Sequence, residues 1–196
     1  MNMGYTGDFM TIEDYKSIIR PMMGERRYNH CVNVSVEAVR LAKKYGADVE
    51  KAEVAGILHD ITKEVDFEKQ LQIIHSGDII LTDVEKKAKK LWHAISGSVY
   101  IQKELGITDV DIINAIRYHT TARANMSLLE KVIFLADFTS AERDYPDVDV
   151  IRAKTEESLE EGMLYGIRFT LNKLLSIDGC LSIDAVDAYN EILLNR

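Results

Sequence analysis

The chain has 196 residues, of which 46% are apolar and 29% are charged, and its formal net charge at pH 7 is −8. This length and apolar content are sufficient to bury the core of one ordinary domain and exclude intrinsic disorder as its general state. The acidic balance argues against nucleic acid or an anionic membrane surface as the main partner, whereas a small anionic ligand is compatible with local basic clusters.

The first ten residues lack the basic start and apolar run of a signal peptide, and no stretch approaches the roughly 20 apolar residues of a membrane span. Cys31 and Cys180 lie far apart and outside any metal-ligand spacing, so a disulfide scaffold is not expected. We therefore expect a cytoplasmic protein with a disordered segment over residues 1–10 and one domain over residues 11–196.

Helical periodicity dominates the chain from its first third onward. Apolar residues at steps of three and four from Val34 to Tyr45 predict a helix that ends at Gly46. Asp48 is expected to cap the next helix, which runs to Leu58.

Three capping signals, each a Ser or Thr followed three residues later by an acidic residue, predict the starts of later helices. They are Thr82–Glu85, the weaker Thr108–Asp111, and Ser127–Glu130. Gly106 is expected to follow the end of the helix that precedes the second of these signals.

The apolar pattern over Thr155–Ser176 predicts a long amphipathic helix, and the pattern over Ile183–Leu193 predicts a final one. We interpret these two helices as scaffold or as the contact of a homodimer. Strand signals are scarce, with no sustained alternation and no hairpin turn between β-rich runs. The prediction is an all-α helical bundle, with a functional core over about residues 26–145 and C-terminal helices over about residues 150–195.

Six residues on or beside the expected core faces of these helices form a set with metal-binding chemistry. A buried carboxylate is costly without a partner, and imidazole with carboxylate is a natural ligand combination for first-row divalent metals in a helical bundle. Taken singly, each histidine has a competing interpretation as a hydrogen-bonded core residue, and His75 is expected in a solvated loop. The candidate metal ligands are His30, His59, Asp60, His93, His119 and Asp137.

The order of these residues, with the adjacent pair His59-Asp60 and separate histidines before the last aspartate, resembles the HD phosphohydrolase superfamily. Local segments resemble its YqeK family, the bacterial symmetrical diadenosine tetraphosphatases. The segments are Arg27–His30, Gly56–Lys63, Trp92-His93, His119–Thr121 and Leu135–Asp137. The sequence departs from the family at Ala122, where Gly is usual, and at Thr139–Ala141, since the usual Glu-Pro before the following arginine is absent.

The resemblance implies an HD-domain bundle with a dinuclear metal site in its core. His30, His59, Asp60 and Asp137 would hold one metal, and His93 and His119 the second, with Asp60 bridging both. The implied cofactors are two divalent or transition metal ions, with iron favoured and manganese, cobalt, zinc and magnesium as alternatives; four imidazoles are unusual for magnesium.

The implied reaction is the symmetrical cleavage of diadenosine tetraphosphate to two ADP by a metal-bridging hydroxide, so the expected partner is a small dinucleoside polyphosphate. The candidate catalytic residues are Asp60, Lys63 and Arg143. The candidate substrate contacts are Arg27, Lys63, Thr120, Thr121, Arg123 and Arg143, which flank the ligand-bearing segments. The arginines could instead pair with surface carboxylates, and the threonines could simply cap a helix.

Three other functions stay open at this point. An HD phosphohydrolase could act on a nucleoside monophosphate or on guanosine tetraphosphate, and product analysis separates these from the first hypothesis. A di-iron HD-type oxygenase would consume oxygen and cleave no phosphate ester. A binding module with structural histidines would hold no stoichiometric metal.

Overall fold

The computed structural model describes residues 10–196, which fold into α-helices joined by short turns and two 3-10 helices. The segment over residues 1–10 that we expect to be disordered lies outside the described residues, except for Met10. The helices are α1 (Ile12–Ile19), α2 (Glu25–Tyr45), α3 (Val49–Leu58), α4 (Phe67–Ser76), α5 (Asp83–Lys87), α6 (Trp92–Lys103), α7 (Val110–Tyr118), α8 (Leu128–Thr139), α9 (Val148–Glu157), α10 (Leu159–Leu175) and α11 (Ile183–Leu194).

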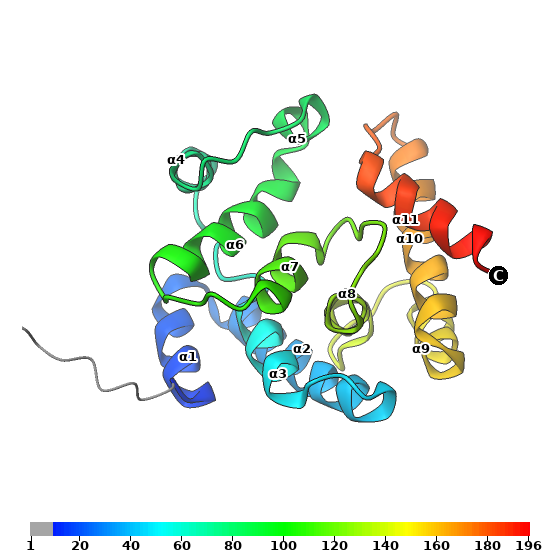
Figure 1. Ribbon diagram of the computed structural model, residues 1–196, viewed down its shortest axis with the longest axis horizontal. Helices are drawn as coiled ribbons and strands as arrows, with labels where there is room; N and C mark the ends of the chain where they lie inside the picture. Colours follow the sequence, from blue (N-terminus) through cyan, green and yellow to red (C-terminus); the bar gives the residue numbers. More distant parts are fainter. Residues whose placement is uncertain (1–9) are drawn as a thin grey trace, which may run out of the picture.

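Helix α8 lies at the centre of the bundle, where Figure 1 shows it end-on. It contacts α2, α3 and α7 on one side and α9 and α10 on the other. Its residues Val132, Ile133, Leu135 and Ala136 are completely buried, because an apolar helix surrounded by neighbours loses contact with water on every face. None of residues 10–196 forms a strand, so the all-α prediction is confirmed. In the same range we find no helix that combines the length and the apolar character needed to cross a membrane.

Most of the predicted helix ends have the expected capping geometry. Thr82 and Ser127 form capping boxes at the starts of α5 and α8, and Asp48 accepts a hydrogen bond from a backbone N–H in the first turn of α3. Gly46 ends α2 with a φ of 80°, a left-handed conformation that glycine adopts without steric cost.

Two predicted boundaries are wrong. Helix α7 is capped by Asp109 and not by Thr108, because the Asp109 carboxylate accepts two backbone N–H groups of the first turn. The long helix predicted over Thr155–Ser176 is two helices, α9 and α10, separated at Ser158. Ser158 has an extended backbone, and its hydroxyl accepts a hydrogen bond from the backbone N–H of Glu161, so it caps the start of α10. In the sequence this capping signal lies within a continuous apolar pattern, and the pattern alone predicts a single helix.

A close approach between α2 and α3 sets the geometry of the interior. Gly56 faces α2 so closely that a Cβ at this position would lie 2.7 Å from the Cα of Ser35. The Ser35 hydroxyl also donates a hydrogen bond to the carbonyl of Glu53, at 2.9 Å. Because α3 lies tightly against α2 here, the residues that follow its end, His59 and Asp60, are brought to the side of α2 that carries His30.

Candidate metal centre

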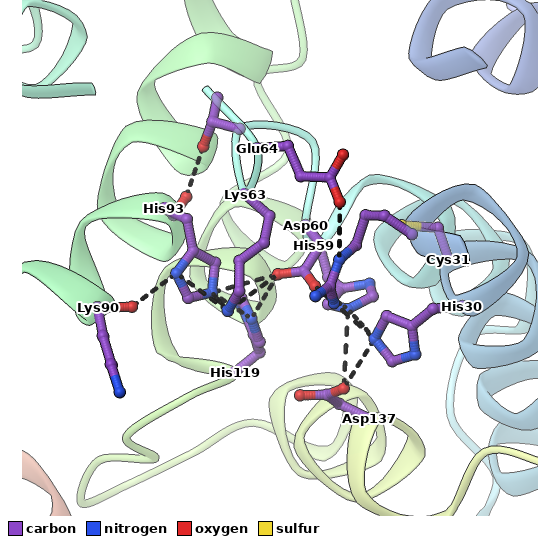
Figure 2. A network of polar contacts seen from close by, with 12 residues as sticks. His30, Cys31, His59, Asp60, Lys63, Glu64, Lys90, His93, His119 and Asp137 are labelled. Atoms are coloured by element: carbon purple, nitrogen blue, oxygen red, sulfur yellow. Dashed lines mark hydrogen bonds and ion pairs between the residues drawn. The ribbon is translucent and has the colours of Figure 1, made fainter. Parts of the chain in front are cut away.

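The six side chains predicted as metal ligands meet at one place in the interior of the bundle (Figure 2). They come from α2, the ends of α3 and α7, the first turn of α6, and α8. The four histidines and the first aspartate are at most 5% exposed, and the side chain of the second aspartate is 18% exposed. The set consists of His30, His59, Asp60, His93, His119 and Asp137.

The carboxylate of Asp60 lies between two pairs of histidines. Its Oδ2 atom is 3.7 Å from Nε2 of His30 and 3.4 Å from Nε2 of His59. Its Oδ1 atom is 3.2 Å from Nε2 of His93 and 3.6 Å from Nε2 of His119. Each carboxylate oxygen therefore faces one histidine pair, which is the arrangement that a bridging ligand requires.

Asp137 completes the first of these two groups. Its Oδ1 atom is 3.1 Å from Nε2 of His30 and 3.9 Å from Nε2 of His59. The first group thus contains two imidazole nitrogens and two carboxylate oxygens, and the second contains two imidazole nitrogens and the other oxygen of Asp60. The two groups are close together, because ligand atoms of Asp137, His59 and His119 also lie within 4.8 Å of one another.

The hydrogen bonds of the histidines determine which ring nitrogens are free. His59, His93 and His119 each donate Nδ1–H to the backbone carbonyl three residues earlier, at 2.7 or 2.8 Å. These bonds assign the proton to Nδ1 and leave a lone pair on Nε2, directed into the cluster.

The donor set fits metal ions well. The Nε2 atoms of His93 and His119 are 3.2 Å apart, as are those of His59 and His30, and Oδ1 of Asp60 is buried with no hydrogen-bond partner within residues 10–196. Lone pairs at this distance repel each other unless a cation or a proton lies between them. Buried imidazole and carboxylate groups in this number suit divalent transition metals.

Burial and neighbouring charges set the protonation of the cluster. Burial lowers the pKa of His59, and it lowers the pKa of His93 to about 4, so both rings are neutral at neutral pH. Burial alone would raise the pKa of Asp60 and Asp137, but the surrounding basic side chains lower both well below the usual range. Burial alone would also lower the pKa of His30, but hydrogen bonds to two neighbouring carboxylates raise it. His59 and His93 therefore present neutral imidazoles, and Asp60 and Asp137 present ionised carboxylates, the forms that bind metals.

Three cationic side chains surround the cluster. Arg27 Nη1 is 2.6 Å from Oδ2 of Asp60, and Lys63 Nζ is 3.8 Å from Oδ1 of the same residue. Arg143 pairs with Oδ1 of Asp137 and donates Nε–H to the backbone carbonyl of that residue at 2.6 Å. These cations lie where an anionic substrate that reaches the cluster would meet them.

A cavity of about 1020 Å³ leads from the surface to this cluster. Arg26, Arg27 and Arg143 contribute positive charge to its wall, and His30 belongs both to the wall and to the cluster. Tyr145 also lines this cavity. The cavity is large enough for part of a nucleotide, and its arginines can hold phosphate oxygens in pairs.

Comparison with known proteins decides the family. The family model described as "HD domain" matches residues 27–142, a segment that contains all six residues of the cluster. The chain belongs to the HD domain family. The adjacent His59-Asp60 pair at the centre of the cluster thus lies within an HD domain, and the resemblance to the HD superfamily is confirmed.

Two curated relatives extend the HD match to nearly the whole chain. The chain is 37% identical over 179 residues to "Bis(5'-nucleosyl)-tetraphosphatase, symmetrical" from Halalkalibacterium halodurans, covering 91% of this chain and 95% of the relative. It is 36% identical over 181 residues to the protein of the same name from Bacillus subtilis, covering 92% and 97%. The chain is therefore an HD-family hydrolase that belongs with these enzymes.

A solved structure agrees with this assignment. It is the crystal structure of a "predicted HD superfamily hydrolase involved in NAD metabolism" from Clostridium acetobutylicum. It superposes with a TM-score of 0.93 and 33% sequence identity, covering 96% of this chain and all of the other. The HD-type helical bundle predicted from the sequence is confirmed.

Not every predicted substrate contact lies at the HD cluster. The Arg123 guanidinium makes two hydrogen bonds to the buried carboxylate of Glu130, at 2.6 and 2.7 Å, and also lies over the ring of Tyr118. The hydroxyl oxygens of Thr120 and Thr121, directly after the ligand-bearing end of α7, are buried and lack a hydrogen-bond partner among the described residues.

Two further residues are placed differently from expectation or were not singled out. His75 is exposed as predicted, but it lies in the last turn of α4 and not in a loop. Glu142, which sequence reasoning did not select, has Oε1 2.5 Å from Nδ1 of His30. Partial burial alone would raise its pKa, but hydrogen bonds from His30, Ser140 and Asn33 lower the pKa of Glu142 to about 2, so it is a carboxylate at neutral pH.

Proposed function

We propose that this hydrolase cleaves diadenosine tetraphosphate symmetrically into two ADP molecules. The observation that carries the proposal is the carboxylate of Asp60 between two histidine pairs, beside a cavity whose wall includes His30 and three arginines. A chain of four phosphates carries several negative charges, and its cleavage requires cations on both the attacked and the leaving phosphate. The names of the two relatives support this substrate among the phosphate compounds that HD hydrolases could take.

Each histidine pair would hold one metal ion together with Asp60. His30 and His59 with Asp137 would complete one site, and His93 with His119 the other. When bound, two such ions supply an acidified water as nucleophile and neutralise negative charge on the phosphoryl oxygens. We favour iron over magnesium, because the donor set is rich in imidazole, and elemental analysis of the purified protein tests this choice.

The side chains around the cluster would bind and orient the polyphosphate. Arg143 and Arg27 present guanidinium groups that can each hold two oxygens of one phosphate, and Lys63 adds a point charge 3.0 Å from Nε2 of His93. The hydroxyls of Thr120 and Thr121, which have no hydrogen-bond partner in the part of the chain that the structure describes, can donate hydrogen bonds to phosphate oxygens. A water oxygen forms a bond to an inner phosphorus, the central bridging P–O bond breaks, and ADP leaves with the bridging oxygen.

Product analysis tests this function. The protein is loaded with metal, incubated with diadenosine tetraphosphate, and the nucleotides are separated by ion-exchange chromatography, alongside Asp60→Ala and the matched control His75→Ala. We expect ADP as the only product, abolished in Asp60→Ala and unchanged in His75→Ala, whose imidazole is exposed on α4. ATP with AMP would contradict symmetrical cleavage. An intact substrate with metal bound would direct the search to other nucleotides and to oxygen uptake.

We also propose that the protein acts in the cytoplasm as a homodimer that uses the C-terminal helices. Ile177 and Ile183, at the turn between α10 and α11, are exposed at 67% and 68%, and Leu194 is exposed at 84%. A second copy of the chain could cover these apolar side chains. Light scattering at the column outlet measures the mass, and a monomer at micromolar concentration would refute the dimer.

A further inference from the structure

The carboxylate of Glu142 makes one half of the cluster different from the other. Three of the four buried histidines donate Nδ1–H to a backbone carbonyl of their own helix segment. His30 alone directs Nδ1 to a carboxylate, Oε1 of Glu142, at 2.5 Å. Glu142 lies 112 positions away in the segment that follows α8, so the contact joins two distant parts of the chain.

The position of Glu142 is itself fixed by neighbouring groups. The hydroxyl of Ser140 donates a hydrogen bond to the same Oε1 atom at 2.9 Å, and Nδ1 of His30, on α2, contacts this atom as well. Ser140 is completely buried, and its backbone N–H bonds to the carbonyl of Ala136 in the last turn of α8. A carboxylate held by a buried serine and by α2 has a defined direction, unlike a solvated surface glutamate.

We propose that Glu142 is a positioning residue that strengthens metal binding in the half of the cluster that contains His30. A carboxylate that accepts Nδ1–H fixes the ring orientation and increases the electron density at Nε2 more than a neutral carbonyl does. The site of His30, His59 and Asp137 is therefore the tighter of the two, and the site of His93 and His119 is the weaker. The inference rests on the proposed metal centre but not on the identity of the substrate.

A purely structural role makes a different prediction. If Glu142 only ties the segment after α8 to α2, its loss lowers stability and affects both metal sites together. If it positions His30, its loss affects one site, and glutamine restores part of the effect because its amide oxygen still accepts the hydrogen bond without the charge.

Metal titration of the metal-free protein distinguishes these roles. Mn²⁺ binding is followed by isothermal titration calorimetry for the wild type, Glu142→Ala, Glu142→Gln and Ser140→Ala, with Asp144→Ala as the matched loss of a carboxylate on the same cavity wall. We expect two ions per chain and, in Glu142→Ala, an affinity of the tighter site reduced by about 10–100-fold while the weaker site is unchanged. Glu142→Gln and Ser140→Ala should lie between the alanine variant and the wild type, and Asp144→Ala should match the wild type.

Unfolding midpoints of the metal-free variants accompany the titration, and Glu142→Gln carries the test if Glu142→Ala does not fold. An equal loss at both sites, or no loss at either, overturns the positioning role while leaving the proposed metal centre intact. A wild type that binds no Mn²⁺ overturns the metal centre and this inference together. Neither result depends on which nucleotide is cleaved.

Discussion

The Nε2 atoms of His93 and His119 lie 3.2 Å apart, although each ring already donates its Nδ1 proton to a backbone carbonyl. Two lone pairs that face each other in a buried site raise the free energy of the metal-free fold. The same geometry prepares the site for a cation, because neither ring has to rotate or to lose a proton. Metal binding and folding stability should therefore be coupled in this protein.

The first prediction concerns that coupling. A divalent transition metal at about 100 times its dissociation constant stabilises a protein by about 2.7 kcal/mol, which for a chain of this size raises Tm by about 5–10 °C. We expect about this shift from each filled site of the wild type, and in His93→Ala, which removes one of the two facing imidazoles, only the shift of the other site should remain. Differential scanning calorimetry with and without chelator measures both. An equal shift in His93→Ala would place the stabilising ion elsewhere, and His75→Ala serves as the control.

A second prediction uses the contact between α2 and α3. In Gly56→Ala the new Cβ would lie 2.7 Å from backbone of α2, so α3 has to move away, at a cost of about 1–3 kcal/mol. The movement displaces His59, so metal affinity should fall as well. Gly97→Ala is the matched control, since its Cβ would meet its nearest atoms at 3.5 Å, an ordinary contact, and it should be neutral or stabilising by up to about 1 kcal/mol.

Urea unfolding of the metal-free proteins and metal titration measure the two effects separately. If Gly56→Ala matched Gly97→Ala in both measurements, the close approach between the two helices would not be what positions the centre.

A third prediction separates two arginines that are both candidate substrate contacts in the sequence, Arg143 and Arg123. Arg143 lies on the cavity wall beside Asp137, so Arg143→Ala should lower kcat/KM by about 10–100-fold in the metal-loaded enzyme, the loss expected for a charged hydrogen bond. Arg123 pairs with Glu130, which is 1% exposed, so Arg123→Ala should leave KM near that of the wild type and lower stability by about 1–3 kcal/mol. If Arg123→Ala raised KM and left stability unchanged, Arg123 would contact the substrate, contrary to this prediction.

Some features of the site follow from the local pattern of the sequence, and others depend on how the chain folds between the interacting residues. The residues of the metal cluster were predictable, because each lies on or beside the apolar face of a helix and the pair His59-Asp60 marks their order. The pairing of Arg123 with Glu130 was not, because it depends on the path of the chain between α7 and α8, where Ala122 adopts a φ of 59°. The local pattern of apolar residues indicates which face of a helix is buried, but it does not indicate which side chain a charged group will contact.

Glu142 is a residue beside the cluster that the sequence did not single out. The sequence differs from the resembled family in this segment, since the usual Glu-Pro before the following arginine is absent over Thr139–Ala141, yet the carboxylate of Glu142 follows directly. In the structure this carboxylate contacts Nδ1 of His30 and accepts a hydrogen bond from the hydroxyl of Ser140. Only the folded geometry identifies the partner of this carboxylate, because the contact joins residues that are 112 positions apart in the chain. The break at Ser158 was readable in the sequence, because Ser-x-x-Glu is a capping signal.

The last prediction concerns acid stability away from the metal cluster. Glu85 closes the capping box of α5 and pairs with Arg117 of α7 at 2.5 Å. Partial burial alone would raise its pKa, but the backbone hydrogen bond at Thr82 and the contact with Arg117 lower the pKa of Glu85 below 4.5 in the folded state. A carboxyl whose folded pKa is depressed contributes stability that is present above its unfolded pKa and is lost as the pH falls through the folded pKa.

Glu85→Gln should therefore unfold more easily than the wild type at pH 7, and the difference should shrink as the pH falls from about 4.5 toward the folded pKa. Urea unfolding of the metal-free proteins at a series of pH values measures this, because the metal cluster then adds no binding contribution. Asp14→Asn removes the equivalent charge from the exposed capping box of α1 and should change stability less across the same range. A difference for Glu85→Gln that persisted unchanged to the most acidic pH would show that packing, and not the charge of Glu85, joins α5 to α7.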